Sequence, residues 1–124
     1  MANKQKRKSS FQHETVLCDL EFPRLQKNLD VLENQEIEQL QKSVDKIQKM
    51  TWDQIYKTSA KSNKRGLNWE PIVGQKTRSG KTVASIRISD KFRARVCRDG
   101  RYMRFISLHP DHDSAYDELG GENL

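Results

Sequence analysis

Long apolar segments are absent from this chain of 124 residues, of which 34% are hydrophobic and 32% are charged. No stretch is long and apolar enough to span a membrane, and the first ten residues, MANKQKRKSS, lack the apolar run of a signal peptide. These absences argue against a membrane-spanning helix. We expect a cytoplasmic protein that does not bind a membrane.

Cysteine is scarce, with Cys18 and Cys97 as the two examples. Both fall in segments that we predict as strands, and they fit no metal-ligand spacing, so we expect buried free thiols in a reducing compartment. The segment GQKTRSGK resembles a phosphate-binding loop, but Gly74 lies one residue too far from Gly80 and no helix follows. We therefore expect no cofactor and no bound metal.

Positive charge exceeds negative charge, with 23 Lys and Arg against 17 Asp and Glu, a formal net charge of +6 and a pI near 9.4. This balance favours an acidic partner, and nucleic acid first. The length suits one small domain with a single core. We predict a flexible basic arm at residues 1–12, one domain at residues 13–118 and a C-terminal tail at residues 119–124.

Helical periodicity occupies residues 23–57. Pro23 suits a first helical turn, and Asn34 is a candidate N-cap for a second helix. Thr51 with Gln54 forms a capping-box pattern that opens a third, short helix. The first two helices should form a hairpin over residues 25–50 that covers a sheet, through the apolar positions Leu25, Leu29, Leu32, Ile37, Leu40, Val44 and Ile47.

Strand signals precede and follow these helices. The sequence predicts a first strand at residues 15–18. It also predicts an edge strand at residues 67–73, interrupted by Pro71, and a mobile loop at residues 74–81. Three alternating strands then run from Thr82 to His109. The predicted fold class is α+β, an N-terminal helical hairpin packed on a mostly antiparallel sheet of four to five strands.

The turns predict how these last strands pair. A loop at residues 89–91 sets Arg87 opposite Arg93 and Ile86 opposite Ala94. A two-residue loop at Asp99-Gly100 predicts the pairs Cys97 with Tyr102, Val96 with Met103, Arg95 with Arg104, Ala94 with Phe105 and Arg93 with Ile106. One face then forms a core from Ala84, Ile86, Ile88, Phe92, Ala94, Val96, Met103 and Phe105. The other, which we call the arginine face, carries Arg87, Arg93, Arg95, Arg104 and Tyr102.

Like charges opposite one another destabilise a sheet, by up to about 1 kcal/mol per pair. Arginine stems can lie flat on a solvated sheet while their guanidinium groups find carboxylates elsewhere. The convergence of Arg87, Arg93, Arg95 and Arg104 on one face favours instead a site for a polyanion, since guanidinium groups form bidentate contacts with phosphate.

The segment SLHPDHDSAY that follows the last strand allows three interpretations. A metal could bind His109, His112 and nearby aspartates, although Pro110 makes joint coordination difficult. His109 and Tyr116 could be structural hydrogen-bonding groups. The third interpretation is a set of proton-transfer groups beside the arginine face, because histidine has an unperturbed pKa near neutral.

The order of elements, with SIRISDKFRARV and SLHPDHDSAY, resembles the RelE/ParE superfamily of toxins from type II toxin-antitoxin systems. The resemblance spans most of residues 14–117. It implies a microbial ribonuclease type of fold and a metal-independent endoribonuclease that cleaves ribosome-associated mRNA and is neutralised by an antitoxin. It places Arg93 on the family's phosphate-contacting arginine, His109 or His112 near its proton-transfer position, and Tyr116 on its C-terminal tyrosine.

These expectations define a candidate site. Catalysis is assigned to Arg87, Arg93, His109, His112 and Tyr116, and RNA binding to Arg95, Tyr102 and Arg104. Which histidine is acid and which is base is left open. Two alternatives have other chemistry: a ParE-like inhibitor that binds gyrase without catalysis, and a plain RNA-binding module that uses the arginine face.

Overall fold

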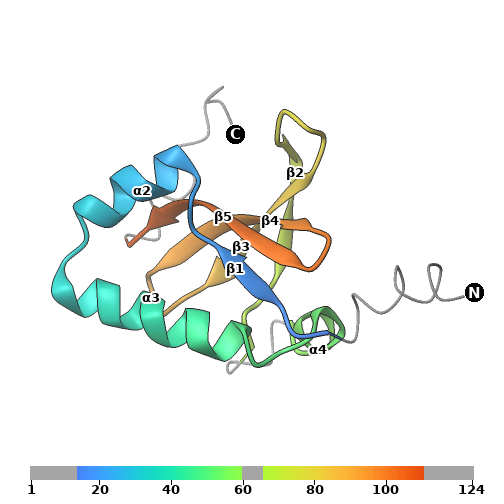
Figure 1. The fold of residues 1–124 in the computed structure, drawn as a ribbon, viewed down its shortest axis with the longest axis horizontal. Coiled ribbons are helices and arrows are strands. Elements are labelled where there is room, and N and C mark those ends of the chain that lie inside the picture. Colours follow the sequence, from blue (N-terminus) through green and yellow to red (C-terminus); the bar gives the residue numbers. More distant parts are fainter. Residues whose placement is uncertain (1–13, 60–65, 111–124) are drawn as a thin grey trace, which may run out of the picture.

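A computed structural model describes residues 14–59 and 66–110 of the chain (Figure 1). The described helices are α2 (Pro23–Asp30), α3 (Asn34–Ile47) and α4 (Trp52–Lys57). The strands are β1 (Leu17–Asp19), β2 (Glu70–Lys76), β3 (Thr82–Arg87), β4 (Arg93–Asp99) and β5 (Tyr102–His109). The predicted α+β class is confirmed. None of the helices in the described ranges is long and apolar enough to cross a membrane.

The five strands form one open sheet in the order β1-β5-β4-β3-β2. β1 pairs with β5 in parallel, and the other neighbours are antiparallel, as we predicted for most of the sheet. The connection from β1 to the rest of the sheet runs through the three helices, and α2 and α3 lie one after the other beside the sheet (Figure 1).

The helix boundaries follow local capping chemistry. α2 begins at Pro23, as predicted, because proline has the fixed φ of a first helical turn. α3 has Glu33 as its N-cap, so our assignment of Asn34 was wrong by one residue; the Glu36 side chain accepts a hydrogen bond from the Glu33 amide at 2.9 Å. α4 has the predicted capping box between Thr51 and Gln54.

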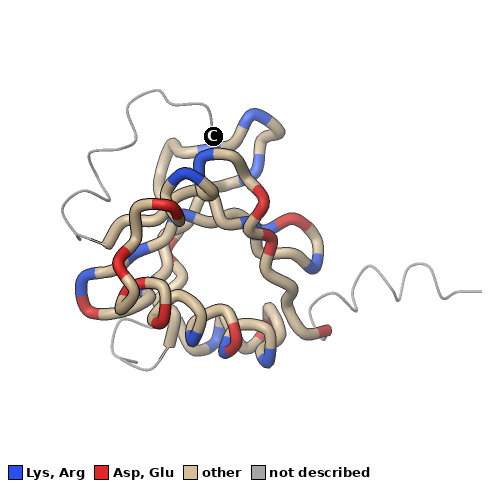
Figure 2. The backbone as a smooth tube through the Cα atoms, turned by 60° about the vertical axis from the view of Figure 1, so that its left-hand side comes forward, with Lys and Arg blue, Asp and Glu red and all other residues tan. Residues whose placement is uncertain are grey.

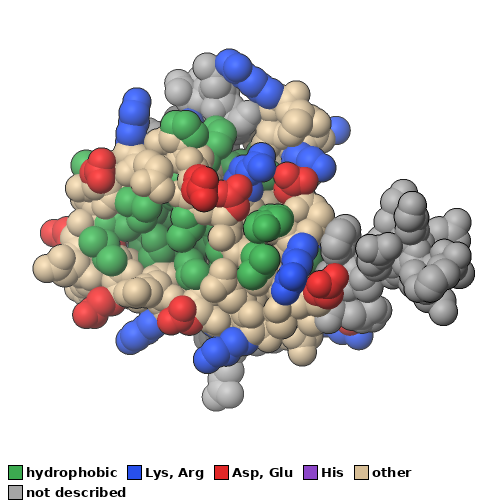
Figure 3. Space-filling model, in the orientation of Figure 1, with side chains coloured by type: hydrophobic (Ala, Val, Ile, Leu, Met, Phe, Trp, Pro, Cys, Tyr) green, Lys and Arg blue, Asp and Glu red, His purple; other side chains and the backbone are tan. Residues whose placement is uncertain are grey.

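The core lies between the helices and the predicted face of the sheet. Leu25 and Ile47 are fully buried and Leu40 is nearly so, and all three pack in one cluster with Ile86, Ala94, Val96, Met103 and Phe105. The helical hairpin over residues 25–50 is therefore confirmed. Cover is incomplete, because Figure 3 shows apolar side chains at the surface between α2, α3 and β1. Leu29, Leu32 and Val44, which pack against the core cluster, are only partly buried.

The β3–β4 hairpin has the predicted register, with Arg87 opposite Arg93 and Ile86 opposite Ala94. The β4–β5 hairpin does not. Asp99 pairs with Tyr102, so the two loop residues are Gly100 and Arg101. Gly100 has φ +62°, the positive value that a type II′ turn requires at its first loop position. The Arg101 carbonyl accepts a hydrogen bond from the Trp52 indole at 3.1 Å, which fixes the loop against α4.

This register corrects the predicted partners of the arginine residues. Arg95 lies opposite Ser107 and Arg104 opposite Cys97, so the expected Arg95–Arg104 pair does not exist. Val96 pairs with Phe105, and a β-bulge between Arg95 and Val96 shifts the register further. Of the two predicted like-charge pairs, Arg87 with Arg93 remains.

β2 begins and ends later than the sequence indicated. The prediction was a strand over residues 67–73 and a loop over residues 74–81, whereas the strand runs from Glu70 to Lys76. Gly74 has φ +80° within a segment where the pairing with β3 is irregular, which lets the strand continue past it. β2 is an edge strand, as its proline suggested.

Candidate nucleic-acid interface

The strand registers place the four arginines of the arginine face in three rows across the sheet. Paired residues share a face, so the rows can be read from the pairing. The first row is Arg87, Arg93 and His109; the second is Glu70, Ser85, Arg95 and Ser107; the third is Val83, Cys97, Arg104 and Asp19. Cationic groups therefore occur in each row, and the first brings two arginines next to a histidine.

Arg87 and Arg93 are held by backbone carbonyl groups at the end of the sheet. Arg93 donates through one guanidinium nitrogen to the carbonyl oxygens of Ser89 at 2.7 Å and Asp90 at 3.2 Å. Arg87 donates to the Gly66 carbonyl at 3.0 Å. These hydrogen bonds orient both guanidinium groups at the end of the sheet, and guanidinium groups held in a fixed orientation suit the binding of an anion.

The β-bulge makes the histidine a neighbour of Arg93. Phe105 and Leu108 both pack in the main core, although strict alternation would point residues three positions apart to opposite faces. Two residues, Ile106 and Ser107, therefore lie between these core positions where strict alternation would place one. The bulge absorbs the extra residue. The bulge adds one residue to the shift of two at the turn, and together they set His109, rather than the predicted Ile106, opposite Arg93.

Three polar residues of this part of the sheet, Arg95, Ser107 and His109, are buried. The Ser107 hydroxyl lies 2.8 Å from Nε2 of His109, and both residues are 2% exposed. Arg95 is 1% exposed. Since Arg87 and Arg93 are only partly buried, they are better placed than Arg95 for direct contact with a ligand.

Arg104 is engaged by carboxylates. Its guanidinium group lies 3.1 Å from a carboxylate oxygen of Asp19 and 3.2 Å from one of Asp99. The hydrogen bond to Asp19 is the largest cause of a raised Arg104 pKa. For this arginine the structure matches the interpretation in which the guanidinium group finds a carboxylate. Tyr102, at the start of β5, is 49% exposed.

Three polar residues of the second row, Ser85, Ser107 and Glu70, were not among the predicted site residues. Ser107 was missed because its position depends on the bulge, which strand alternation does not show. Glu70 was predicted inside the edge strand over residues 67–73 without a pairing partner, and its pairing with Ser85 brings it into the row of Arg95. Nothing in the sequence around Glu70 and Pro71 indicates that Glu70 would pair with Ser85.

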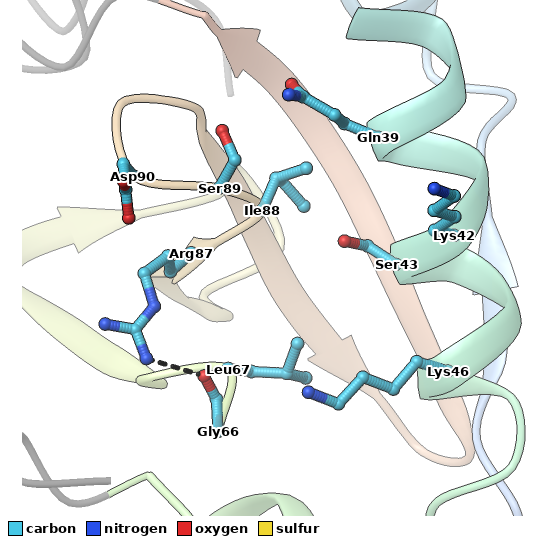
Figure 4. A pocket seen from close by; sticks show the side chains of 10 residues that line it. All are labelled: Gln39, Lys42, Ser43, Lys46, Gly66, Leu67, Arg87, Ile88, Ser89 and Asp90. Atoms are coloured by element: carbon cyan, nitrogen blue, oxygen red, sulfur yellow. Dashed lines mark hydrogen bonds between the residues drawn. The ribbon is translucent and has the colours of Figure 1, made fainter. Parts of the chain in front are cut away.

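A cavity of about 530 Å³ opens beside Arg87. Figure 4 shows Ser43 and Lys46 of α3 on one side, and the Arg87 guanidinium group with its hydrogen bond to Gly66 on the other. Lys42 and Asp90 also line it, so the cavity has both signs of charge. The cavity thus brings Lys42 and Lys46 of α3 to the same side of the molecule as Arg87.

Elsewhere in the described residues, acidic and basic side chains are mixed along the chain. Figure 2 shows acidic and basic residues interspersed, with basic residues at the tip of the β2–β3 hairpin. The case for an anion site therefore depends on the rows of the arginine face, and net charge adds little to it.

Part of the predicted site lies outside the described residues. His112 and Tyr116 are in residues 111–124, as is the tail at 119–124, and the basic arm at 1–12 lies before residue 14. Within residues 14–59 and 66–110, no group of three or more His, Cys, Asp or Glu residues is arranged to hold a metal ion.

Both cysteines are free and lie in strands, as predicted, with Cys97 buried and Cys18 partly buried. Burial raises the Cys18 pKa from 9.0 to about 12. The folded state thus favours the neutral thiol, and stability should fall as pH rises from about 9 towards 12, where the unfolded chain ionises first.

We predict that an aromatic disulfide reagent at pH 8 will modify Cys18 slowly in the folded protein and rapidly in denaturant, because the thiolate is the reacting form. Equal rates in the two states would show that the thiol is not protected by the fold.

Comparison with protein-family models, with curated proteins and with solved structures found no match for this chain.

Proposed function

We propose that this protein is an RNA-cleaving toxin of the RelE/ParE type, which holds the phosphate backbone of mRNA on the arginine face. The observation that carries the proposal is the first row of that face, where Arg93 lies between Arg87 and His109. The order of strand, helices and antiparallel sheet on which the resemblance depends also supports it.

The proposed reaction is metal-independent transesterification. A base removes the proton of a 2′-hydroxyl group, that oxygen attacks the adjacent phosphorus, and the 5′-oxygen of the next nucleotide leaves with a proton from an acid. Arg93 and Arg87 stabilise the charge that develops on the phosphoryl oxygens. His109 is buried against Ser107 and suits a positioning role, so we assign proton transfer to His112.

A second candidate function is a plain RNA-binding module. The 2% exposure of His109 favours it, because a buried imidazole cannot reach a substrate without rearrangement. Binding would then depend on the arginine face alone.

The proposed partners are mRNA, in the context of the ribosome, and a co-expressed antitoxin. The apolar side chains exposed between α2, α3 and β1 support a protein partner, as does Val31, which is 78% exposed. Affinity purification from the native host should recover a small acidic protein. Recovery of gyrase subunits alone would instead support the gyrase-inhibitor alternative.

The test of catalysis is expression of the intact chain in bacteria, followed by mapping of mRNA ends, with purified protein and RNA in EDTA as the in vitro counterpart. We expect growth arrest and new ends that carry a 2′,3′-cyclic or 3′-phosphate. Activity that EDTA removes and a divalent metal restores would contradict the mechanism. Intact mRNA with RNA binding would leave the binding module.

A further inference from the structure

A second cavity lies on the arginine face, beside the tip of the β2–β3 hairpin. It has a volume of about 210 Å³ and is lined by Phe22, Thr77, Arg78, Ser79, Arg104 and Ile106. Pockets for drug-sized ligands have volumes of about 300–1,000 Å³, so this one admits a smaller group such as a single planar ring system.

The walls of the cavity combine apolar and cationic groups. Ile106 is 1% exposed and belongs to a small apolar cluster with Val83 and Cys97, against which Phe22 and Ile72 pack. Arg104 contributes a guanidinium group that two carboxylates hold in place. Arg78, at the exposed tip of the hairpin, adds a positive charge at the mouth.

The hairpin tip that closes the cavity is itself ordered by hydrogen bonds. The Thr77 amide donates to the Lys81 carbonyl at 2.8 Å, and the Gly80 amide to the Thr77 carbonyl at 2.9 Å. The hydroxyl groups of Thr77 and Ser79 lie 3.0 Å apart. The wall is therefore a closed turn with two hydroxyl groups, which can bond to the polar edge of a bound ring.

The bulge of β5 lies between the cavity and the proposed phosphate site. Ile106 lines the cavity and Ser107, the next residue, lies in the second row with Arg95. Cys97 pairs with Arg104, which lines the cavity, and lies four residues from Arg93 on β4. The two sites are therefore about 13 Å apart along the strand, at roughly 3.3 Å per residue. A short single strand can therefore reach both sites at once.

We propose that this cavity binds one nucleobase of a single-stranded RNA whose phosphates lie on Arg87 and Arg93. Single-stranded RNA is recognised by stacking of its bases on aromatic side chains and on guanidinium planes, which Phe22 and Arg104 offer. The positive charge at the mouth complements the adjoining phosphate. The proposal rests on the proposed function, because it takes the ligand of the arginine face to be RNA.

The test compares an RNA with a polyanion that has no bases. A fluorescent 2′-O-methyl oligonucleotide, which cannot undergo transesterification, is titrated by anisotropy, and inorganic polyphosphate is titrated as a competitor. Ser79→Trp should fill the cavity mouth from an exposed position. Val73→Trp adds the same side chain at a position of the same hairpin that is 98% exposed and does not line the cavity, and serves as the control.

We expect Ser79→Trp to weaken RNA binding by about 5- to 150-fold, the range that stacking of one base contributes, and to leave polyphosphate binding unchanged. Val73→Trp should change neither. Unchanged RNA affinity in Ser79→Trp, or equal losses for RNA and polyphosphate, would overturn the cavity proposal while the arginine face still binds RNA. Absence of any RNA binding by the unchanged protein would overturn both proposals.

Discussion

Arg93→Lys should lower the rate of RNA cleavage by about 10²- to 10³-fold, the loss typical for removal of one donor to a developing oxyanion. Lysine keeps the charge but lacks the planar group that can contact two phosphoryl oxygens at once. The effect should appear in the cleavage step measured in single-turnover reactions, with a smaller change in RNA affinity.

The matched control is Arg104→Lys, the same substitution in the third row of the arginine face. Because Asp19 and Asp99 hold Arg104 in the wall of the proposed base cavity, the substitution should weaken RNA binding and leave the cleavage rate of bound RNA nearly unchanged. Arg93 also donates to turn carbonyls, so a thermal melt of each variant is needed. Equal effects of the two variants on turnover would remove Arg93 from the reaction.

Phe105→Ala should lower the free energy of unfolding by about 3–5 kcal/mol, the usual cost of replacing a buried phenylalanine by alanine. Phe105 has no exposed surface and belongs to the cluster that joins the helical hairpin to the sheet. The change removes packing partners of both layers and leaves a cavity between them.

Urea titration followed by circular dichroism measures this loss. Val73→Ala, at a position 98% exposed on β2, is the control and should stay within about 0.5 kcal/mol of the unchanged protein. A stability loss for Phe105→Ala as small as that of the control would show that the helices do not pack on this face of the sheet.

The core could be predicted from sequence because strand alternation has a period of two. The predicted register of the β4–β5 hairpin is wrong by two residues at the turn, since Cys97 pairs with Arg104 where Tyr102 was expected. A shift of two residues keeps every side chain on its face. Met103 and Phe105 therefore lie in the core as predicted, although their partners differ.

The candidate site was harder to predict because it depends on partners as well as on faces. Asp99-Gly100 and Gly100-Arg101 both provide a glycine for a two-residue turn, and in the observed turn the Arg101 carbonyl accepts a hydrogen bond from the distant Trp52 indole. The bulge then adds one more residue of shift. Neither feature has a signal in the alternation of β4 and β5, so the approach of His109 to Arg93 emerges only from the fold.

The central claim is that RNA binds the arginine face, and chemical-shift mapping tests it most directly. The ¹⁵N-labelled protein is titrated with the 2′-O-methyl oligonucleotide, and shifts are followed for backbone amides and arginine side chains. We predict the largest shifts at Arg87, Arg93 and Ser107. Shifts confined to α3, where Lys42 and Lys46 line the other cavity, would contradict the account.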